Sequence, residues 1–237
     1  MTQTDSPAQS EPVRQFRFRL PPGGCDIILV RHGESQPAVP GVAFPTVNGQ
    51  ADPPLADEGH REARAMADRL RHEDVSAIYT SSLTRTKQTA APLAEYLGIT
   101  PVEEPDLREV YLGEWDGGEY RIRMRSGDPL VADIVAQQDW APIPGAESMA
   151  DLCARVKPAL ERIAARHADQ RVVVVAHGGV IGAALHLATR ADQFAFVVSA
   201  NASISHLVIT EDRWILRRFN DTGHLATDLD KPVQPMT

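Results

Sequence analysis

Short apolar runs alternate with amphipathic segments along most of this chain. Asp26 to Val30 is apolar and rich in β-branched residues, and it ends directly at Arg31. Val172 to Ala176 repeats the pattern and also ends at a basic residue. Runs of this kind are typical of strands that are buried on both faces. We therefore predict two neighbouring strands of a parallel sheet.

Two amphipathic helices are the clearest of the helical patterns. Over residues 57–73 the apolar positions recur at helical spacing, namely Ala63, Met66, Ala67 and Leu70. Asp57 is expected to be the N-cap of this helix. A second helix is expected to begin at Ser148, because Ser148 and Asp151 stand at capping-box spacing.

Further elements complete the alternation of strands and helices. Residues 77–80 predict a strand, and the helix after it is expected to end at Gly98. A helix over 180–189 and two strands over 203–210 and 213–219 are expected near the C-terminus. Such an alternation predicts the α/β class, as a three-layer sandwich with a mostly parallel central sheet.

The length of 237 residues is sufficient for one large domain. We expect that domain over residues 23–227, a disordered polar lead-in over 1–22 and a flexible tail over 228–237. Residues 117–145 fit the alternation poorly, so we expect a lid-like insertion there that covers the site.

Charge and composition restrict the partners. The formal net charge of −8 argues against nucleic acid and against an anionic membrane surface, because both require an extended basic surface. Two cysteines provide no disulfide framework, and no apolar run approaches the ~20 residues that span a bilayer. We expect a cytoplasmic protein, and the oligomeric state stays open, with a homodimer among the options. An anionic ligand would need a local basic pocket.

Basic residues follow three of the predicted strands. Arg31 and His32 follow the first, His177 and Gly178 follow another, and Arg85 opens the helix after a third. Ligands of open α/β sheets bind at the carboxyl ends of the strands, so these residues are expected to converge. Arginine matches phosphate oxygens bidentately, and helix N-termini attract anions. The sequence therefore predicts a pocket for a phosphoryl group.

Several motifs occur in a recognisable order between about Asp26 and Phe219: "LVRHGES", "GQADPPLADEGHREA", "IYTSSLTRTKQTA", "LREVYLGEWDG", "GAES" and "VVVVAHGGVI". Together they resemble the histidine phosphatase superfamily, which includes cofactor-dependent phosphoglycerate mutases and many phosphomonoesterases. The resemblance implies a phosphoglycerate mutase-like fold and an enzyme of the histidine acid phosphatase type. Because arginines can supply the positive charge, we expect that neither a cofactor nor a metal is required.

The resemblance implies five catalytic residues. His32 is the nucleophile that becomes phosphorylated, Glu109 protonates the leaving oxygen, and the phosphoryl oxygens are bound by Arg31, Arg85 and His177. An imidazole with its ordinary pKa of ~6.5 is largely neutral, hence nucleophilic, near neutral pH. The carboxyl must start protonated, which requires a pKa above its ordinary ~4.3. These opposing demands predict a bell-shaped pH profile.

Three further residues are expected to bind substrate by the same resemblance. Gly178 is expected to add a backbone contact, and Asn48 and Gly49 align loosely with a substrate-contact position of the mutases. The acid has nearby alternatives, since Glu114 and Asp116 are also carboxylates and any of these side chains can simply pair with an arginine.

One spacing suggests a different chemistry. Cys25 and Arg31 stand at the C-x5-R spacing of cysteine-dependent phosphatases. The residues between them form a predicted strand, which places Cys25 roughly 20 Å away at ~3.3 Å per residue, so the spacing is accidental. The remaining histidines have no convergent partners and are expected to be solvated or packed: His60, His72, His167, His186, His206 and His224.

Departures from the mutase pattern favour hydrolysis. Mutases resembling this family carry a tryptophan and an asparagine after "RHGES" and an asparagine after the final "HG", whereas this chain has Pro37, Ala38 and Gly179. We predict a metal-independent phosphomonoesterase that acts on a small-molecule phosphate monoester through phosphohistidine on His32. Two alternatives stay open, a cofactor-dependent phosphoglycerate mutase and a non-catalytic phospho-ligand binding module. The intact set of catalytic residues counts against the second.

Three arginines lie inside the predicted insertion. Arg121, Arg123 and Arg125 are open to two interpretations: they bind a second acidic group of the substrate, as basic residues do in mutases, or they form a solvated charged helix face. The solvated face is the more usual role of such a run and is the expectation here. The identity of the substrate is left open.

Overall fold

A computed structural model describes residues 15–225 of the protein. The predicted tail over 228–237 therefore lies outside the described residues, and the predicted lead-in is described only from residue 15 onward. Residues 15–22 form no helix or strand. Within the described range, none of the helices is long and apolar enough to cross a membrane.

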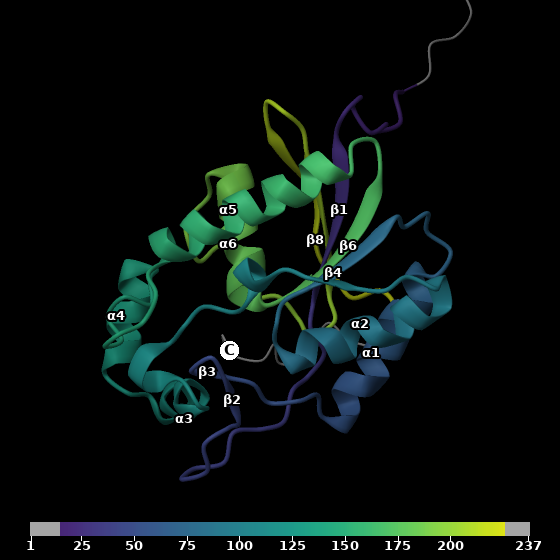
Figure 1. The fold of residues 1–237 in the computed structure, drawn as a ribbon. Coiled ribbons are helices and arrows are strands. Elements are labelled where there is room, and N and C mark those ends of the chain that lie inside the picture. Colours follow the sequence, from purple (N-terminus) through teal and green to yellow (C-terminus); the bar gives the residue numbers. More distant parts are fainter. Residues whose placement is uncertain (1–14, 226–237) are drawn as a thin grey trace, which may run out of the picture.

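A six-stranded sheet forms the centre of the protein (Figure 1). Its strands lie in the spatial order β5 (Val102–Glu103), β4 (Ala77–Thr80), β6 (Arg171–Ala176), β1 (Cys25–Arg31), β7 (Ile204–Ile209) and β8 (Trp214–Asp221). The pairs β5–β4, β4–β6 and β6–β1 are parallel, and the predicted neighbours β1 and β6 pair with Val30 opposite Val175. The remaining pairs, β1–β7 and β7–β8, are antiparallel, which the sequence pattern did not reveal.

Two pairs of helices cover the two faces of the sheet, as Figure 1 shows. These helices are α1 (Asp57–Leu70) and α2 (Thr84–Leu97) on one face, and α5 (Met149–Arg166) and α6 (Gly178–Thr189) on the other. Side chains alternate along β1, so Ile28 packs toward α1 and α2 while Ile27 and Leu29 pack toward α5 and α6. The three-layer α/β sandwich with a mostly parallel sheet is confirmed.

The helix ends test the capping predictions. Ser148 Oγ accepts a hydrogen bond from the Asp151 amide at 3.1 Å, and the full capping box of α5 is present. Gly98 ends α2 with a left-handed φ of 65°. The prediction that Asp57 caps α1 is wrong, because Ala56 is the N-cap and Asp57 is the first helical residue. In the first turn its carboxylate still faces the positive end of the helix dipole.

The segment predicted as a lid-like insertion contains two short helices, α3 (Glu119–Ser126) and α4 (Leu130–Gln137). They lie beside the sheet on the same side as α5 and α6 (Figure 1). Tyr120, Ile134 and Trp140 are buried in the hydrophobic core that α5 and α6 form with the sheet. The segment is therefore anchored in the main core, and its motion as a lid stays a prediction.

Shorter elements connect this segment and the sheet. They are the hairpin β2 (Thr46–Val47) and β3 (Gln50–Ala51) and the 3₁₀ turns η1 (Pro105–Leu107) and η2 (Gly113–Trp115). The hairpin lies between β1 and α1, and the two 3₁₀ turns lie between β5 and α3.

A buried carboxylate ties three strands together at the opposite end of the sheet. Asp26 on β1 is 6% exposed, and it accepts hydrogen bonds from Arg171 on β6 at 2.9 Å and from His206 on β7. Burial opposes ionisation of Asp26, but its hydrogen bonds to His206 and Arg171 and the charges of both outweigh burial, so its pKa is lowered. The sequence had indicated no partner for His206.

Replacing Asp26 by asparagine is expected to lower the free energy of unfolding at pH 7 by about 2 kcal/mol, because Arg171 loses its buried carboxylate partner. The folded-state pKa is lowered, so the stabilisation is present above the unfolded pKa of ~3.9 and is lost as the pH falls through the folded value. Urea denaturation of both proteins between about pH 7 and pH 3 measures this difference.

The matched control is Asp68→Asn, which removes the exposed ion pair with Arg71 on α1. That change is expected to cost less than ~1 kcal/mol at every pH. The difference in free energy of unfolding between the wild type and Asp26→Asn should shrink at low pH and exceed that of the control. A difference that stays constant, or that equals that of the control, would contradict the stabilising role of the Asp26 carboxylate.

Candidate active site

His32 lies at the carboxyl end of β1, where the strand leaves the sheet. It is 4% exposed, and its Nδ1 lies 2.7 Å from the carbonyl oxygen of Gly33. A carbonyl oxygen only accepts, so Nδ1 carries the ring proton and Nε2 carries the lone pair. Arg85 Nε donates toward that lone pair at 3.2 Å. The imidazole is thus fixed in the tautomer that a nucleophilic Nε2 requires.

Arg85 is held over His32 by the start of α2. The carboxylate of Asp52 accepts hydrogen bonds from the Thr84 amide at 2.7 Å and from the Thr84 hydroxyl at 2.6 Å, and it lies 4.0 Å from Arg85. The Arg85 guanidinium also donates to the Ala51 carbonyl at 3.1 Å. Burial lowers the pKa of Arg85 to about 10, so the group remains charged at neutral pH.

Arg31 precedes His32 and contributes a second buried cation. It is 5% exposed, and its guanidinium donates to the carbonyl of Ser199. Burial lowers its pKa to about 10 as well, while the carboxylates of Glu109 and Glu62 oppose that shift. Two guanidinium groups, one on β1 and one on α2, therefore lie near His32 and lower its pKa.

His177 joins the site from the end of β6. It is fully buried, its Nε2 lies 2.8 Å from Ser81 Oγ, and its ring centroid lies 5.2 Å from that of His32. Within residues 15–225 its Nδ1 is buried without a hydrogen-bond partner. An unpartnered buried polar atom costs free energy, so this nitrogen is suited to a ligand oxygen. Gly178 follows as the first residue of α6.

Glu109 places its carboxyl group against the start of α6. Its Oε1 accepts hydrogen bonds from the Val110 amide at 2.9 Å and from the Gly179 amide at 3.1 Å. A Cβ atom at position 179 would lie 2.6 Å from that oxygen, so a side chain there would force the Glu109 carboxyl group to shift. The departure from the mutase asparagine at this position therefore leaves room for that carboxyl group.

Opposite pKa shifts make the two reacting groups compatible. Burial, with the charges of Arg85 and Arg31, lowers the pKa of His32 well below its ordinary value. Burial raises the pKa of Glu109, although both arginines oppose this. At ordinary values of ~6.5 and ~4.3, a neutral histidine and a protonated glutamate would rarely coexist. The shifts allow both states in one molecule.

The structure brings together most of the predicted site residues: Arg31, His32, Arg85, Glu109, His177 and Gly178. It does not bring Asn48 and Gly49 to them. Both residues form the exposed turn of the β2–β3 hairpin, with φ values of 51° and 80°. The strand after the turn reaches the site instead, because Gln50 Nε2 donates to the Glu109 carbonyl at 2.6 Å. Gln50 belongs to a strand of only two residues, which is too short to show a periodic pattern in the sequence.

A cavity of about 680 Å³ opens beside His32. Its wall combines apolar side chains with charged ones, among them Pro37, Ile122, Met124, Arg121 and Arg125. A second cavity, of about 730 Å³, is lined by residues of α5, α6 and the β7–β8 turn and contains none of the predicted site residues. Of these two cavities, the one at His32 can therefore hold a reacting ligand. A smaller cavity of about 60 Å³ is lined by His32, Arg85 and Glu109 together.

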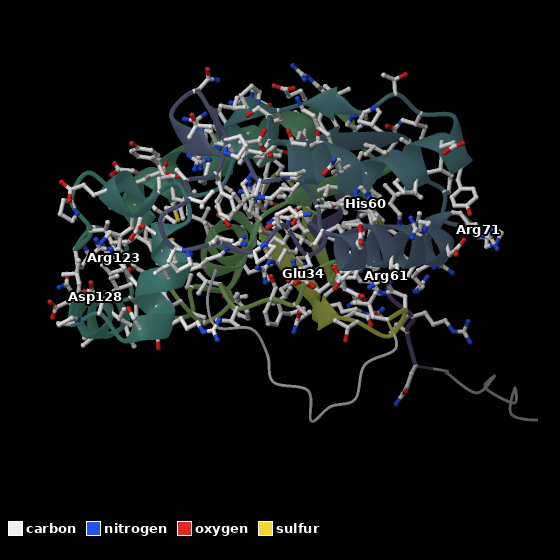
Figure 2. All side chains as sticks on the ribbon, turned by 90° about the horizontal axis from the view of Figure 1, so that it is seen from below. Glu34, His60, Arg61, Arg71, Arg123 and Asp128 are labelled. Carbon is white, nitrogen blue, oxygen red and sulfur yellow. The ribbon has the colours of Figure 1, made fainter. Side chains whose placement is uncertain are left out.

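Arg121 belongs to this site, so the expectation of a solvated face is wrong for it. It donates to Ser35 Oγ at 2.7 Å and to the Gln36 carbonyl at 2.9 Å, directly after the "RHGE" stretch. Arg123 behaves differently, since it pairs with Asp128 at 3.0 Å at the outer end of the segment, far from Glu34 at the cavity (Figure 2).

Cys25 has no part in the site. It is fully buried at the opposite end of β1 from Arg31, and burial raises the pKa of its thiol to about 12. A thiol that stays protonated is a poor nucleophile, so the C-x5-R spacing is accidental, as predicted. Across residues 15–225, no group of three or more His, Cys, Asp or Glu side chains is arranged to hold a metal ion.

Comparison with known proteins agrees with this geometry. A metal-independent phosphoserine phosphatase of Arabidopsis thaliana is 33% identical over 205 residues, which cover 85% of this chain and 84% of that protein. A probable phosphoglycerate mutase of Yersinia pestis is 31% identical over 206 residues, covering 84% and 94%. The solved structure of a mycobacterial glucosyl-3-phosphoglycerate phosphatase matches with a TM-score of 0.68 at 27% identity, over 84% of this chain and all of that one.

The family model of the histidine phosphatase superfamily (branch 1) matches residues 27–222. That range contains both histidines, both arginines and the glutamate described above, and it covers most of the chain. The protein therefore belongs to the histidine phosphatase superfamily.

Proposed function

We propose that the protein is a phosphomonoesterase of the histidine acid phosphatase type that acts through a phosphohistidine on His32. One observation carries the proposal: the Nδ1 proton of His32 is committed to the Gly33 carbonyl, which leaves the Nε2 lone pair facing Arg85. A carboxyl group with a raised pKa, Glu109, lies in the same pocket. Such a pairing has no purpose in a module that only binds a phosphate.

In the first step the substrate phosphoryl group is bound by Arg31, Arg85 and the Nδ1 of His177. The Nε2 of His32 attacks phosphorus, and the bond from phosphorus to the leaving oxygen breaks. Glu109 transfers its proton to that oxygen, so the alcohol leaves neutral and the carboxylate remains. The imidazolium character of the product is stabilised by the Gly33 carbonyl.

In the second step water replaces the alcohol. The Glu109 carboxylate takes a proton from the water, whose oxygen attacks phosphorus while the bond to Nε2 breaks. Inorganic phosphate, neutral His32 and protonated Glu109 result, so the cycle closes. The guanidinium groups supply the positive charge that both transition states require.

The cavity beside His32 is proposed to hold the leaving group. Arg121 and Arg125 line it together with apolar side chains, which suits a leaving group that carries an anionic substituent. The names of two relatives specify phosphoserine and glucosyl-3-phosphoglycerate, and both compounds carry a carboxylate besides the phosphate ester. We propose the same class of substrate for this protein.

The mutase remains the second candidate, because the Yersinia pestis relative is a probable phosphoglycerate mutase. The departures from the mutase pattern at Pro37, Ala38 and Gly179 favour hydrolysis. The cytoplasmic location, the oligomeric state and the limits of the domain stay predictions from the sequence.

Replacing His32 by alanine is expected to lower phosphate release by at least ~10³-fold, because the nucleophile is removed. It is also expected to abolish an acid-labile, base-stable phosphoryl label on the protein. Release of inorganic phosphate from a panel of monoesters in the presence of EDTA measures the first effect. His60→Ala, on α1 (Figure 2), is the control and is expected to leave both readouts unchanged.

Unchanged activity of His32→Ala would refute the assignment of the nucleophile. A wild-type protein that is labelled but interconverts the two phosphoglycerates with bisphosphoglycerate, without releasing phosphate, would favour the mutase. A wild type that neither becomes labelled nor releases phosphate would favour the binding module.

The pH dependence of kcat/KM is expected to be bell-shaped. The acid limb reports protonation of His32 and is displaced below ~6.5, and the alkaline limb reports ionisation of Glu109 and is displaced above ~4.3. Glu109→Gln is expected to lose the alkaline limb, because an amide does not ionise. Initial rates from about pH 4 to pH 9 test this, with exposed Glu114→Gln as the control that retains both limbs.

Arg121→Gln is expected to raise KM by about 10-fold for a monoester whose leaving group carries a carboxylate, since a charge-assisted hydrogen bond is lost. KM for a neutral alkyl monoester is expected to stay the same. Steady-state kinetics with the two substrates provide the measurement, and Arg123→Gln, which removes the outer ion pair with Asp128, is the control. Equal changes for both substrates would exclude a role of Arg121 in leaving-group binding.

A further inference from the structure

Arg155 lies on α5 and connects that helix to the main chain around Glu109. Its side chain is 13% exposed. Nη1 donates to the carbonyls of Asp106 and Arg108, both at 2.7 Å, and Nη2 donates to the carbonyl of Glu109 at 2.9 Å. Nε and Nη2 donate to the two carboxylate oxygens of Glu147 at 2.6 and 2.8 Å. Every N–H group of the guanidinium therefore has an acceptor.

These carbonyls belong to the turn that leads from η1 into Glu109. Outside helices and sheets, such carbonyls find no regular partner in the backbone, so a side chain that satisfies several of them defines the path of the turn. A planar guanidinium presents its donors in one rigid plane and in fixed directions. Arg155 thus imposes one arrangement on the main chain before the acid.

Glu147 extends the connection to the other side of the acid. Its carboxylate accepts a hydrogen bond from the Tyr111 amide at 3.2 Å, and its own amide donates to the Tyr111 carbonyl at 2.8 Å. The pair of Arg155 and Glu147 therefore contacts the chain both before and after Glu109. The main chain on both sides of Glu109 is therefore held by one residue of α5 and one residue that directly precedes this helix.

The position of the carboxyl group depends on this main chain. Glu109 Oε1 is bound by the adjacent Val110 amide and by the Gly179 amide at 3.1 Å. A main-chain shift of ~1 Å would break the contact with Gly179 and move the proton away from the leaving oxygen, and misplacements of this size cost up to ~10²-fold in rate. None of the contacts of Arg155 requires it to touch the substrate.

We propose that Arg155, oriented by Glu147, is a positioning residue that holds Glu109 where it can protonate the leaving oxygen. This inference rests on the proposed function, in which Glu109 is the general acid. Its specific consequence concerns the leaving group. A leaving alkoxide needs the proton of Glu109, whereas nitrophenolate leaves without one, so a misplaced acid slows the transfer of the phosphoryl group to His32 only for the first class of substrate. The later hydrolysis of phosphohistidine is common to both substrates.

The experiment compares kcat/KM for an alkyl phosphate with kcat/KM for p-nitrophenyl phosphate in the same preparation, because kcat/KM reports the steps up to departure of the leaving group. Arg155→Lys keeps the charge but cannot reach the carbonyls and Glu147 together. It is expected to lower kcat/KM for the alkyl phosphate at least ~10-fold more than kcat/KM for the nitrophenyl ester. Because both rates come from one preparation, an inactive or unfolded fraction cancels from their ratio. Glu147→Gln, which keeps Arg155 but weakens its orientation, is expected to change the ratio in the same direction by a smaller factor.

Arg162→Lys is the matched control. Arg162 lies on the same helix and contacts the same turn, through the side chains of Glu104 at 3.0 Å and Asp106 at 2.7 Å, but on its exposed side. It makes no hydrogen bond to the Glu109 carbonyl among the described contacts. Its substitution is expected to leave the ratio unchanged.

Glu109→Gln separates this inference from the function on which it rests. If Glu109→Gln does not lower the alkyl rate selectively, the assignment of the acid fails. If Glu109→Gln is selective but Arg155→Lys lowers both rates equally, or neither, the positioning role of Arg155 is overturned while the proposed function stands.

Discussion

The burial of positive charge at the carboxyl end of β1 is the constraint on which the site depends. Arg31 and Arg85 lie inside the protein beside His32, and burial lowers the pKa of each guanidinium only to about 10, so both stay charged. Their charges add to burial in disfavouring protonation of His32, which keeps its Nε2 lone pair available. A phosphoryl dianion suits such a pocket, because guanidinium groups bind phosphate oxygens by charge-assisted hydrogen bonds.

The same environment sets the state of Glu109. The arginines favour its carboxylate, yet burial dominates and raises its pKa, so the group is suited to start as an acid. Its carboxyl group takes up space at the start of α6 that a side chain at position 179 would share. Polar residues from separate elements hold these groups: Asp52 holds the start of α2, and Arg155 holds the turn before Glu109. The chemistry therefore depends on a second set of residues that never contact the substrate.

Sequence patterns predicted the strands and the residues at their ends for a local reason. An apolar run such as Val172 to Ala176 is identified by composition alone, and the residue after it necessarily lies at the edge of the sheet. Side chains that reach the site from loops were less predictable. Asn48 and Gly49 form an exposed turn, whereas the next residue, Gln50, contacts Glu109. Nothing in the sequence indicates which of these three residues reaches the site. Arg121 likewise resembled its neighbour Arg123 until the structure placed the two in different surroundings.

The sequence by itself determined the α/β class, the strand that carries Arg31 and His32, and the capping of α5, because each follows from contacts between near neighbours in the chain. Only the tertiary structure decided which carboxyl has a raised pKa, which nitrogen of His32 carries the lone pair and which arginine contacts the main chain of Glu109. Those properties depend on burial and on hydrogen bonds between segments far apart in the sequence, such as Arg155 with the turn at Glu109. Such contacts exist only once the layers of the sandwich have packed together, and no periodicity of the chain records them.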